Sequence, residues 1–264
     1  MAYADSAGVR IHYEVAGNGF PLVLQTGGGG DHAMWREAGY VAGLTGFRLV
    51  LLDHRGHGMS DRPPGVAAHR IERYVADVLA VLEAERIARA AFWGYSGGAT
   101  VGYALAAAHP DRIAGLVTTG AIGATDYDTV AEREDAQRRA AYAREHGLLA
   151  LLARAFDTSP AGGVPPWFWR QMDATDREMF ALQLLGAAEW HGPWSVLPRI
   201  TAPTLLLVGA AEDPDGDNSR AAAAMPNARC VTFAGLDHLT AYVRSDLALG
   251  AALPLLRAVA AATG

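Results

Sequence analysis

The residues that could carry out covalent chemistry in this sequence begin with Ser96. It stands in the pentapeptide Gly94-Tyr95-Ser96-Gly97-Gly98, after a short apolar run at 90–93 and before a run of small residues at 99–109. The first run predicts a buried strand and the second a helix, so the pentapeptide has the strand–turn–helix context that a G-x-S-x-G motif requires. A hydroxyl at the apex of such a turn would project into a cleft at the positive end of the helix.

The turn at Ser96 predicts a role for the glycines around it. We expect Ser96 to have backbone dihedral angles that are unfavourable for a residue with a Cβ atom. Gly94 and Gly98 flank it, and side chains at these positions would collide with the neighbouring strand and helix. The alternative is a glycine-rich turn with an incidental serine, so the hypothesis of a nucleophile depends on finding its partners.

A serine hydroxyl is a weak nucleophile at neutral pH and requires an adjacent base, which in turn requires an orienting acid. The sequence has nine histidines. His238 is the best candidate for the base, because it directly follows the last predicted strand, where the carboxyl edge of a sheet would present it. His54 and His57 lie in an arginine- and glycine-rich loop, which we expect them to hold in place.

Three aspartates are candidates for the orienting acid. Asp213 directly follows a buried strand, and Glu212 beside it is the nearest substitute. Asp237 is adjacent to His238, and neighbouring residues on an extended segment point apart. Asp126 would suit an acid placed after the sixth strand, but that strand ends without a carboxylate. We therefore predict that Asp213 orients His238.

The elements that must position these residues alternate between strand and helix. Strands are predicted at 3–5, 9–15, 20–25, 47–52, 90–93, 113–117, 203–208 and 229–233, the first two as a hairpin. Helices are predicted at 34–44, 70–85, 99–109, 130–144, 173–185 and 219–224, and from 240 to the C-terminus. This alternation predicts an α/β fold with a mainly parallel eight-stranded sheet flanked by helices. Ligands of such sheets bind beyond the carboxyl ends of the strands.

The alternation stops after the sixth strand. We expect residues 1–121 and 198–264 to form the core and residues 122–197 to form a helical cap inserted over the edge of the sheet. Three tryptophans of this segment, Trp167, Trp169 and Trp194, are candidates to line a pocket for an apolar substrate. The alternative is that they only attach the cap to the core.

The composition excludes several classes of protein. The net charge of −6 and the absence of a basic cluster give no reason to expect nucleic-acid binding. The single cysteine, Cys230, excludes an internal disulfide and is expected to be a buried structural thiol. The N-terminus lacks the features of a signal peptide, and no apolar stretch approaches the length that spans a bilayer. We expect a cytoplasmic protein that binds a small-molecule substrate and neither nucleic acid nor a membrane, and the sequence leaves its oligomeric state open.

These features together resemble an α/β-hydrolase-fold serine hydrolase over nearly the whole chain. Four segments carry the resemblance: Gly94-Tyr95-Ser96-Gly97-Gly98, Asp53-His54-Arg55-Gly56-His57-Gly58-Met59-Ser60, Asp213, and Gly235-Leu236-Asp237-His238. The order Ser96, Asp213, His238 is the nucleophile–acid–base order of that family. The second segment is similar to the family's D-x-R-G-x-G-x-S loop, which the resemblance implies to be structural.

The resemblance also implies an oxyanion hole. One backbone N–H would come from Gly97 and the other from the loop Thr26–Gly30, from Gly28 or alternatively from Gly29. The family often has His-Gly in this loop, and the four glycines here are expected to widen the acyl side of the pocket. Gly29 and Tyr95 are therefore expected beside the substrate. A plain flexible loop is the alternative interpretation.

The resemblance implies a hydrolase that cleaves a carboxylic ester or lactone of a small, apolar substrate through an acyl-enzyme on Ser96. No metal and no cofactor are expected. Haloalkane dehalogenases and epoxide hydrolases of this fold use an aspartate nucleophile, so Ser96 argues against both. A carbon–carbon bond hydrolase of the same fold remains an alternative, and so does a non-catalytic ligand-binding protein or receptor that kept the pocket.

Overall fold

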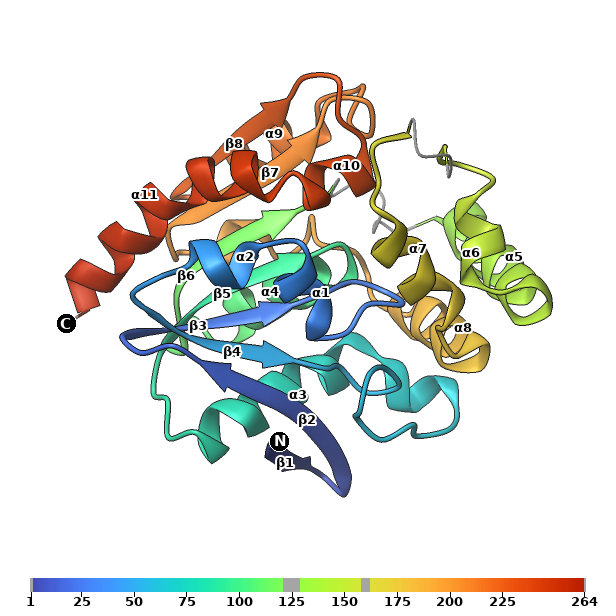
Figure 1. Ribbon diagram of the computed structural model, residues 1–264, viewed down its shortest axis with the longest axis horizontal. Coiled ribbons are helices and arrows are strands. Elements are labelled where there is room, and N and C mark those ends of the chain that lie inside the picture. Colours follow the sequence, from blue (N-terminus) through green and yellow to red (C-terminus); the bar gives the residue numbers. More distant parts are fainter. Residues whose placement is uncertain (1, 121–128, 158–161, 264) are drawn as a thin grey trace.

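The computed structural model describes residues 2–120, 129–157 and 162–263. An eight-stranded sheet runs through the centre of the molecule (Figure 1). Its strands are β1 (Ala2–Ser6), β2 (Val9–Ala16), β3 (Phe20–Gln25), β4 (Phe47–Leu52), β5 (Ala90–Tyr95), β6 (Ile113–Thr119), β7 (Thr204–Gly209) and β8 (Ala228–Phe233). All eight predicted strands are present.

The strand order is β1-β2-β4-β3-β5-β6-β7-β8. Only the pairs β1–β2 and β2–β4 are antiparallel, and the other pairs are parallel. The central strands are apolar runs because helices cover both of their faces. This arrangement confirms the predicted mainly parallel α/β sheet.

Helices cover the two faces of the sheet. On one face lie α3 (Ile71–Ala84), α4 (Gly97–Ala108) and α9 (Asp217–Ala224), and on the other lie α1 (Ala33–Glu37), α2 (Tyr40–Gly43), α10 (His238–Val243) and α11 (Ser245–Thr263). A short 3₁₀ turn, η1 (Val66–His69), precedes α3, and a second one, η4 (Leu197–Arg199), precedes β7. Each face has its own apolar core, so the sheet is a rigid support for the loops at its edge.

Two predicted helices are each divided in the structure. The helix expected at 34–44 is α1 followed by α2, because Gly39 adopts a left-handed backbone conformation with φ of 87°. The helix expected from 240 onward is α10 followed by α11, with a break at Arg244.

Four α-helices lie between β6 and β7 in the described residues: α5 (Val130–His146), α6 (Leu148–Leu152), α7 (Pro166–Asp173) and α8 (Arg177–Ala187). They lie beyond the carboxyl ends of the strands (Figure 1). Only α5 and α8 correspond to predicted helices. The helix α7 was not predicted, and it begins with Pro166 in the first turn, where a missing N–H costs no hydrogen bond. The predicted start of the cap at residue 122 lies outside the described residues, as does Asp126.

The C-terminal helix α11 corrects the expectation about apolar segments. It has 19 residues and a mean hydropathy of 1.4, so by length and composition it could cross a membrane, and 22% of it is buried. In the structure, α11 packs against β6, β7 and α2. Its buried residues are Ala248, Ala252, Leu256 and Val259. Length and composition alone do not distinguish this core contact from a membrane span.

Candidate active site

Ser96 lies at a sharp turn between β5 and α4. Its backbone has φ of 54° and ψ of −119°, a strained conformation for a residue with a side chain. Hydrogen bonds on both sides hold the turn: the Ser96 N–H donates to Thr119 O at 2.8 Å, and Ser96 O accepts from the N–H of Ala99 at 2.9 Å. The strained turn expected at this serine is therefore present.

The glycines around Ser96 permit close approach of four backbone segments. A Cβ atom built on Gly94 would lie 2.3 Å from Gly98 O, and one on Gly98 would lie 2.3 Å from Gln25 O. A Cβ on Gly27 would lie 2.4 Å from the Cβ of Ser96. Real side chains do not tolerate such distances, so the predicted need for glycine at 94 and 98 is confirmed.

His238 is the first residue of α10, and its imidazole contacts a carboxylate. The Nδ1 atom lies 2.7 Å from Oε2 of Glu212, and the two side chains are 20% and 10% exposed. The ring of Tyr95 stacks on that of His238, with centroids 5.1 Å apart, and the Tyr95 hydroxyl donates to His238 O at 3.3 Å. These contacts fix the imidazole on two sides.

The prediction that Asp213 orients His238 is wrong, because the carboxylate at Nδ1 belongs to Glu212. After β7 the chain makes a tight turn in which the Glu212 N–H donates to Gly209 O at 3.2 Å. Oε1 of Glu212 also accepts from the Gly209 N–H at 3.1 Å, so the side chain folds back toward the end of the strand. Asp213 turns away and accepts the N–H of Asn218 near the start of α9 at 3.2 Å.

Asp237 caps α10 and does not orient His238. This agrees with the expectation that neighbouring side chains point apart. Its Oδ1 accepts the N–H groups of Leu239 and Thr240 at 3.1 and 2.8 Å. Asp237 is therefore the N-cap of α10. In return, the Thr240 hydroxyl oxygen accepts the N–H of Asp237 at 2.8 Å, which completes a capping box. The cap holds the helix start that carries His238.

Ser96 and His238 line the same cavity. Gly120, after β6, lies close to both residues: a Cβ atom there would lie 2.9 Å from Cε1 of His238 and 3.6 Å from the Ser96 backbone nitrogen. Gly120 has φ of 115°, which favours glycine. A side chain at this position would therefore clash with the imidazole of His238.

Gly28 and Gly97 line the cavity beside Ser96. A Cβ on Gly97 would lie 3.6 Å from the Gly28 nitrogen, so the two amides are neighbours. No hydrogen bond within the described ranges uses the N–H of either glycine. Gly97 is also in the first turn of α4, where helix N–H groups lack intrahelical partners. The two amides can therefore donate to a ligand oxygen.

His54 supports the loop that carries Gly28. Its Nε2–H donates to Gly27 O at 3.1 Å, and its Nδ1 accepts from the side-chain amide of Gln25 at 3.3 Å. Burial, together with the neighbouring His57, lowers the pKa of His54 well below 6.5. The ring is therefore neutral at pH 7 and can donate at one nitrogen while accepting at the other.

Gly29 does not line the cavity, so its predicted contact with substrate is not found. It has φ of 80°, and its carbonyl oxygen accepts from Nε2 of Gln171 and Oγ1 of Thr175, both at 3.2 Å. Both donors come from the segment of α7 and the turn after it. Gly29 thus attaches the glycine-rich loop to the helices above it.

The cavity has a volume of about 300 Å³ and a mainly apolar lining. Tyr95 lines it, as predicted, whereas Trp167, Trp169 and Trp194 do not. Phe168, between two of these tryptophans in the sequence, lines the cavity instead. Its ring packs against those of Trp167 and Trp169, with centroids 5.8 and 5.5 Å apart. Trp167 and Trp169 point elsewhere because, on a helix such as α7, the residues on either side of an inward-facing residue point to other sides.

Gln183 of α8 also reaches the site and was not among the predicted site residues. Its side chain is 9% exposed, and its Oε1 has no hydrogen-bond partner in the described part of the chain. The amide lies over both glycines: Oε1 is 3.2 Å from a Cβ built on Gly28, and Nε2 is 3.2 Å from one on Gly97. The available signal was a lone amide among the apolar residues of this helix.

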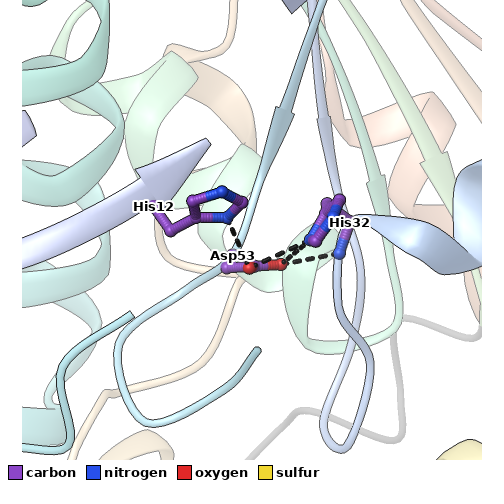
Figure 2. A group of neighbouring side chains, drawn as sticks. All are labelled: His12, His32 and Asp53. Atoms are coloured by element: carbon purple, nitrogen blue, oxygen red, sulfur yellow. Dashed lines mark hydrogen bonds and ion pairs between the residues drawn. The ribbon is translucent and has the colours of Figure 1, made fainter. Parts of the chain in front are cut away.

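The loop after β4 is held by Asp53, which His12 and His32 approach from two sides (Figure 2). Nδ1 of His12 lies 2.8 Å from Oδ2, and Nδ1 of His32 lies 2.9 Å from Oδ1. The N–H groups of His32 and Met59 also donate to the carboxylate, at 2.6 and 3.0 Å. This agrees with the structural role expected of the segment Asp53–Ser60.

The same three side chains offer potential metal ligands, all within 4.8 Å of one another. A bound cation would have to replace the hydrogen bonds that both imidazoles make to Asp53. None of His12, His32 and Asp53 is among the residues that line the cavity. As arranged, the group is a hydrogen-bonded cluster that joins β2, the loop after β3 and the loop after β4.

A family model of the alpha/beta hydrolase fold matches residues 21–244. The chain belongs to the α/β-hydrolase family. The match extends from β3 through the turn at Ser96 and the helices above the sheet to the end of α10, so it includes every described residue that lines the cavity.

This α/β hydrolase is 32% identical over 114 residues to epoxide hydrolase A of Mycobacterium tuberculosis, a match that covers 42% of the chain and 35% of that protein. It is 32% identical over 120 residues to 2-hydroxymuconate semialdehyde hydrolase of Pseudomonas sp. strain CF600, covering 45% and 42%. The matches thus span less than half of these relatives. The solved enol-lactonase of Burkholderia xenovorans LB400 superposes with a TM-score of 0.82 at 28% identity, over 97% of this chain and 100% of that one.

Proposed function

We propose that this α/β hydrolase is a serine hydrolase that cleaves carboxylic ester or lactone bonds through an acyl-enzyme on Ser96. The observation that carries the proposal is the joint geometry of one cavity. A strained serine, a histidine held by a carboxylate and two neighbouring backbone amides all face it. Nucleophile, base, orienting acid and oxyanion donors are the components that acyl transfer requires.

In the proposed first step, His238 takes the proton of the Ser96 hydroxyl as the oxygen attacks the acyl carbonyl carbon. The carbonyl π electrons move to the oxygen, and the N–H groups of Gly28 and Gly97 stabilise the resulting anion. Such donors typically contribute about 3 kcal/mol each to transition-state stabilisation. Glu212 holds the tautomer of His238 that keeps Nε2 free and stabilises its cation.

The tetrahedral intermediate then collapses to the acyl-enzyme, and His238 gives its proton to the leaving oxygen. In the second half of the reaction, water attacks the acyl-enzyme and gives a proton to His238. When this second intermediate releases the acid, His238 returns the proton to the oxygen of Ser96. The amide of Gln183, above the two oxyanion glycines, would contact a polar atom of the substrate next to the scissile bond.

The likeness to the enol-lactonase supports the ester or lactone class, since it extends over nearly the full length of both chains. The match to an epoxide hydrolase does not extend to its chemistry, because the nucleophile of that class is an aspartate and position 96 is a serine. The match to 2-hydroxymuconate semialdehyde hydrolase favours carbon–carbon bond hydrolysis as the second candidate.

The experiment is a series of p-nitrophenyl esters of increasing acyl length, together with lactones followed by proton release, on the wild type and on Ser96→Ala. We expect turnover in the wild type and its loss in the variant. The preferred acyl length would indicate the size of the part of the cavity that holds the acyl chain. Hydrolysis that Ser96→Ala retains would contradict the mechanism, and ligand binding without turnover would favour the non-catalytic alternative.

A further inference from the structure

Arg139 of α5 lines the cavity that contains Ser96 and is partly buried there. It is the one permanent cation among the described residues that form this lining. The proposed reaction leaves its role open, because acyl transfer at Ser96 requires no cation beyond the oxyanion donors and His238.

Three acidic side chains of α5 and α8, Glu134, Asp135 and Glu178, are paired with other arginines. Arg138, the residue before Arg139, bonds to Asp135 at 3.3 Å and lies 4.0 Å from Glu134 on the outer side of α5. Further along the helix, Arg144 pairs with Glu178 of α8 at 2.6 Å. In the ranges that the structure describes, Arg139 itself has no carboxylate within ion-pair distance.

The rest of the cavity does not supply the missing negative charge. Glu212 is the only carboxylate in the described lining, and it contacts His238. Two buried side-chain atoms of the described lining lack a partner, Oγ1 of Thr100 and Oε1 of Gln183, and both belong to neutral residues, which are 4% and 9% exposed. A guanidinium in a mainly apolar cavity is best stabilised by an anion, and its planar fork matches a carboxylate.

We propose that the natural substrate carries a carboxylate at the end of its acyl part and that Arg139 binds it. The apolar lining between Arg139 and Ser96 would contact the carbon chain between the carboxylate and the scissile carbonyl. This inference rests on the proposed ester or lactone hydrolysis and names its substrate class. Arg139 is then a specificity-determining residue, since it discriminates an acidic acyl chain from a neutral one of equal length.

The test compares two matched series in a proton-release assay. One contains the half-methyl esters of straight dicarboxylic acids with about four to eight carbons, and the other the methyl esters of monocarboxylic acids of the same length. The proteins are the wild type, Arg139→Leu, Arg139→Lys and the control Arg138→Leu, whose arginine side chain is 66% exposed. The preference is the ratio of kcat/KM for the acidic ester to that for the neutral one.

We expect the wild type to prefer the acidic ester about tenfold or more at one chain length, as a charge-assisted pair predicts. Arg139→Leu should lower the ratio about tenfold through KM, Arg139→Lys should retain part of it, and Arg138→Leu should keep it. A wild type without this preference would overturn the proposal. A ratio that Arg139→Leu leaves unchanged would overturn it as well.

Failure of the proposed hydrolysis would look different, since neither series would be cleaved. In that case the half-esters are titrated calorimetrically into Ser96→Ala, with and without Arg139→Leu. Binding of the acidic ester that Arg139→Leu weakens about tenfold supports the carboxylate site independently of catalysis. Equal binding by the two proteins, or no binding, would overturn it.

Discussion

At the scale of single residues, two neighbouring acids show how one position in a turn decides which carboxylate contacts His238. Glu212 and Asp213 are adjacent carboxylates at the end of β7, and only the first contacts His238. The turn from Gly209 to Glu212 returns the longer side chain to the sheet edge, whereas Asp213 accepts the N–H of Asn218. Sequence spacing could name both candidates but not the direction in which each points.

The two neighbouring acids give a matched pair of variants. We expect Glu212→Gln to lower kcat for a p-nitrophenyl ester by roughly 10²- to 10⁴-fold, because the amide leaves His238 without its anion and allows the wrong tautomer. Asp213→Asn should stay within about threefold of the wild type. Steady-state kinetics of the two variants measures this difference. A large loss of kcat in Asp213→Asn, together with near wild-type kcat in Glu212→Gln, would show that Asp213 is the orienting acid.

At the scale of elements, the glycine-rich loop after β3 is fixed by contacts on both sides. His54 donates to Gly27 O from the loop after β4, and Gln171 and Thr175 donate to Gly29 O from the helices above. The amide of Gly28 between them is thereby held next to that of Gly97. The interpretation of this segment as a plain flexible loop does not agree with these contacts.

His54 is therefore a positioning residue for the proposed oxyanion hole. We expect His54→Phe, which keeps a ring but removes the hydrogen bond to Gly27 O, to lower kcat about tenfold with little change in KM. His54→Gln restores a donor and should keep more activity than His54→Phe. Comparison of kcat and KM for both variants checks this. Wild-type kcat in His54→Phe would contradict the positioning role.

The elements were predicted best where one local signal dominated. Continuous apolar runs predicted the central strands, because buried parallel strands have no polar face. The first two strands, which pair antiparallel, were predicted as a hairpin. The helices were harder: Gly39 divides α1 from α2, and α7 begins at a Pro-Pro sequence that reads as a loop. Which residues of α7 and α8 face the cavity depends on how these helices are rotated against the sheet. Phe168 and Gln183 were therefore missed, while the tryptophans were wrongly favoured.

At the scale of the whole molecule, the Asp53 cluster joins segments that are far apart in the sequence. Both carboxylate oxygens accept hydrogen bonds, from His12 and Met59 on one and from His32 on the other. Burial raises the pKa of Asp53, but its hydrogen bond and charge contact with His32 outweigh this effect, and the net pKa lies below 3.8. The same hydrogen bond raises the pKa of His32 above 6.5.

We expect Asp53→Asn to lower the free energy of unfolding by about 3 kcal/mol, because the new NH₂ group would face N–H donors in a buried site. Asp53 contributes its full share to the free energy of unfolding above its pKa in the unfolded state, and this share is lost as the pH falls through its lowered pKa in the folded state. His32 contributes its full share below its pKa in the unfolded state, and this share is lost as the pH rises through its raised pKa in the folded state. The difference between wild type and variant should thus be largest between pH 3.8 and 6.5.

Denaturant unfolding at several pH values measures this difference. Asp61→Asn is the control, since its exposed pair with Arg10 should contribute about 1 kcal/mol or less. Equal stability of Asp53→Asn and the wild type at all pH values would contradict the structural role of the cluster.

The most direct test of the account is where an acyl-type reagent reacts. The wild type, Ser96→Ala and Glu212→Gln are treated with a fluorophosphonate, and the modified residue is mapped by mass spectrometry of peptides. We expect one label, on Ser96, which is absent from Ser96→Ala and forms more slowly in Glu212→Gln. An unlabelled wild type, or a label on another residue that persists in Ser96→Ala, would contradict the assignment of Ser96 as the nucleophile.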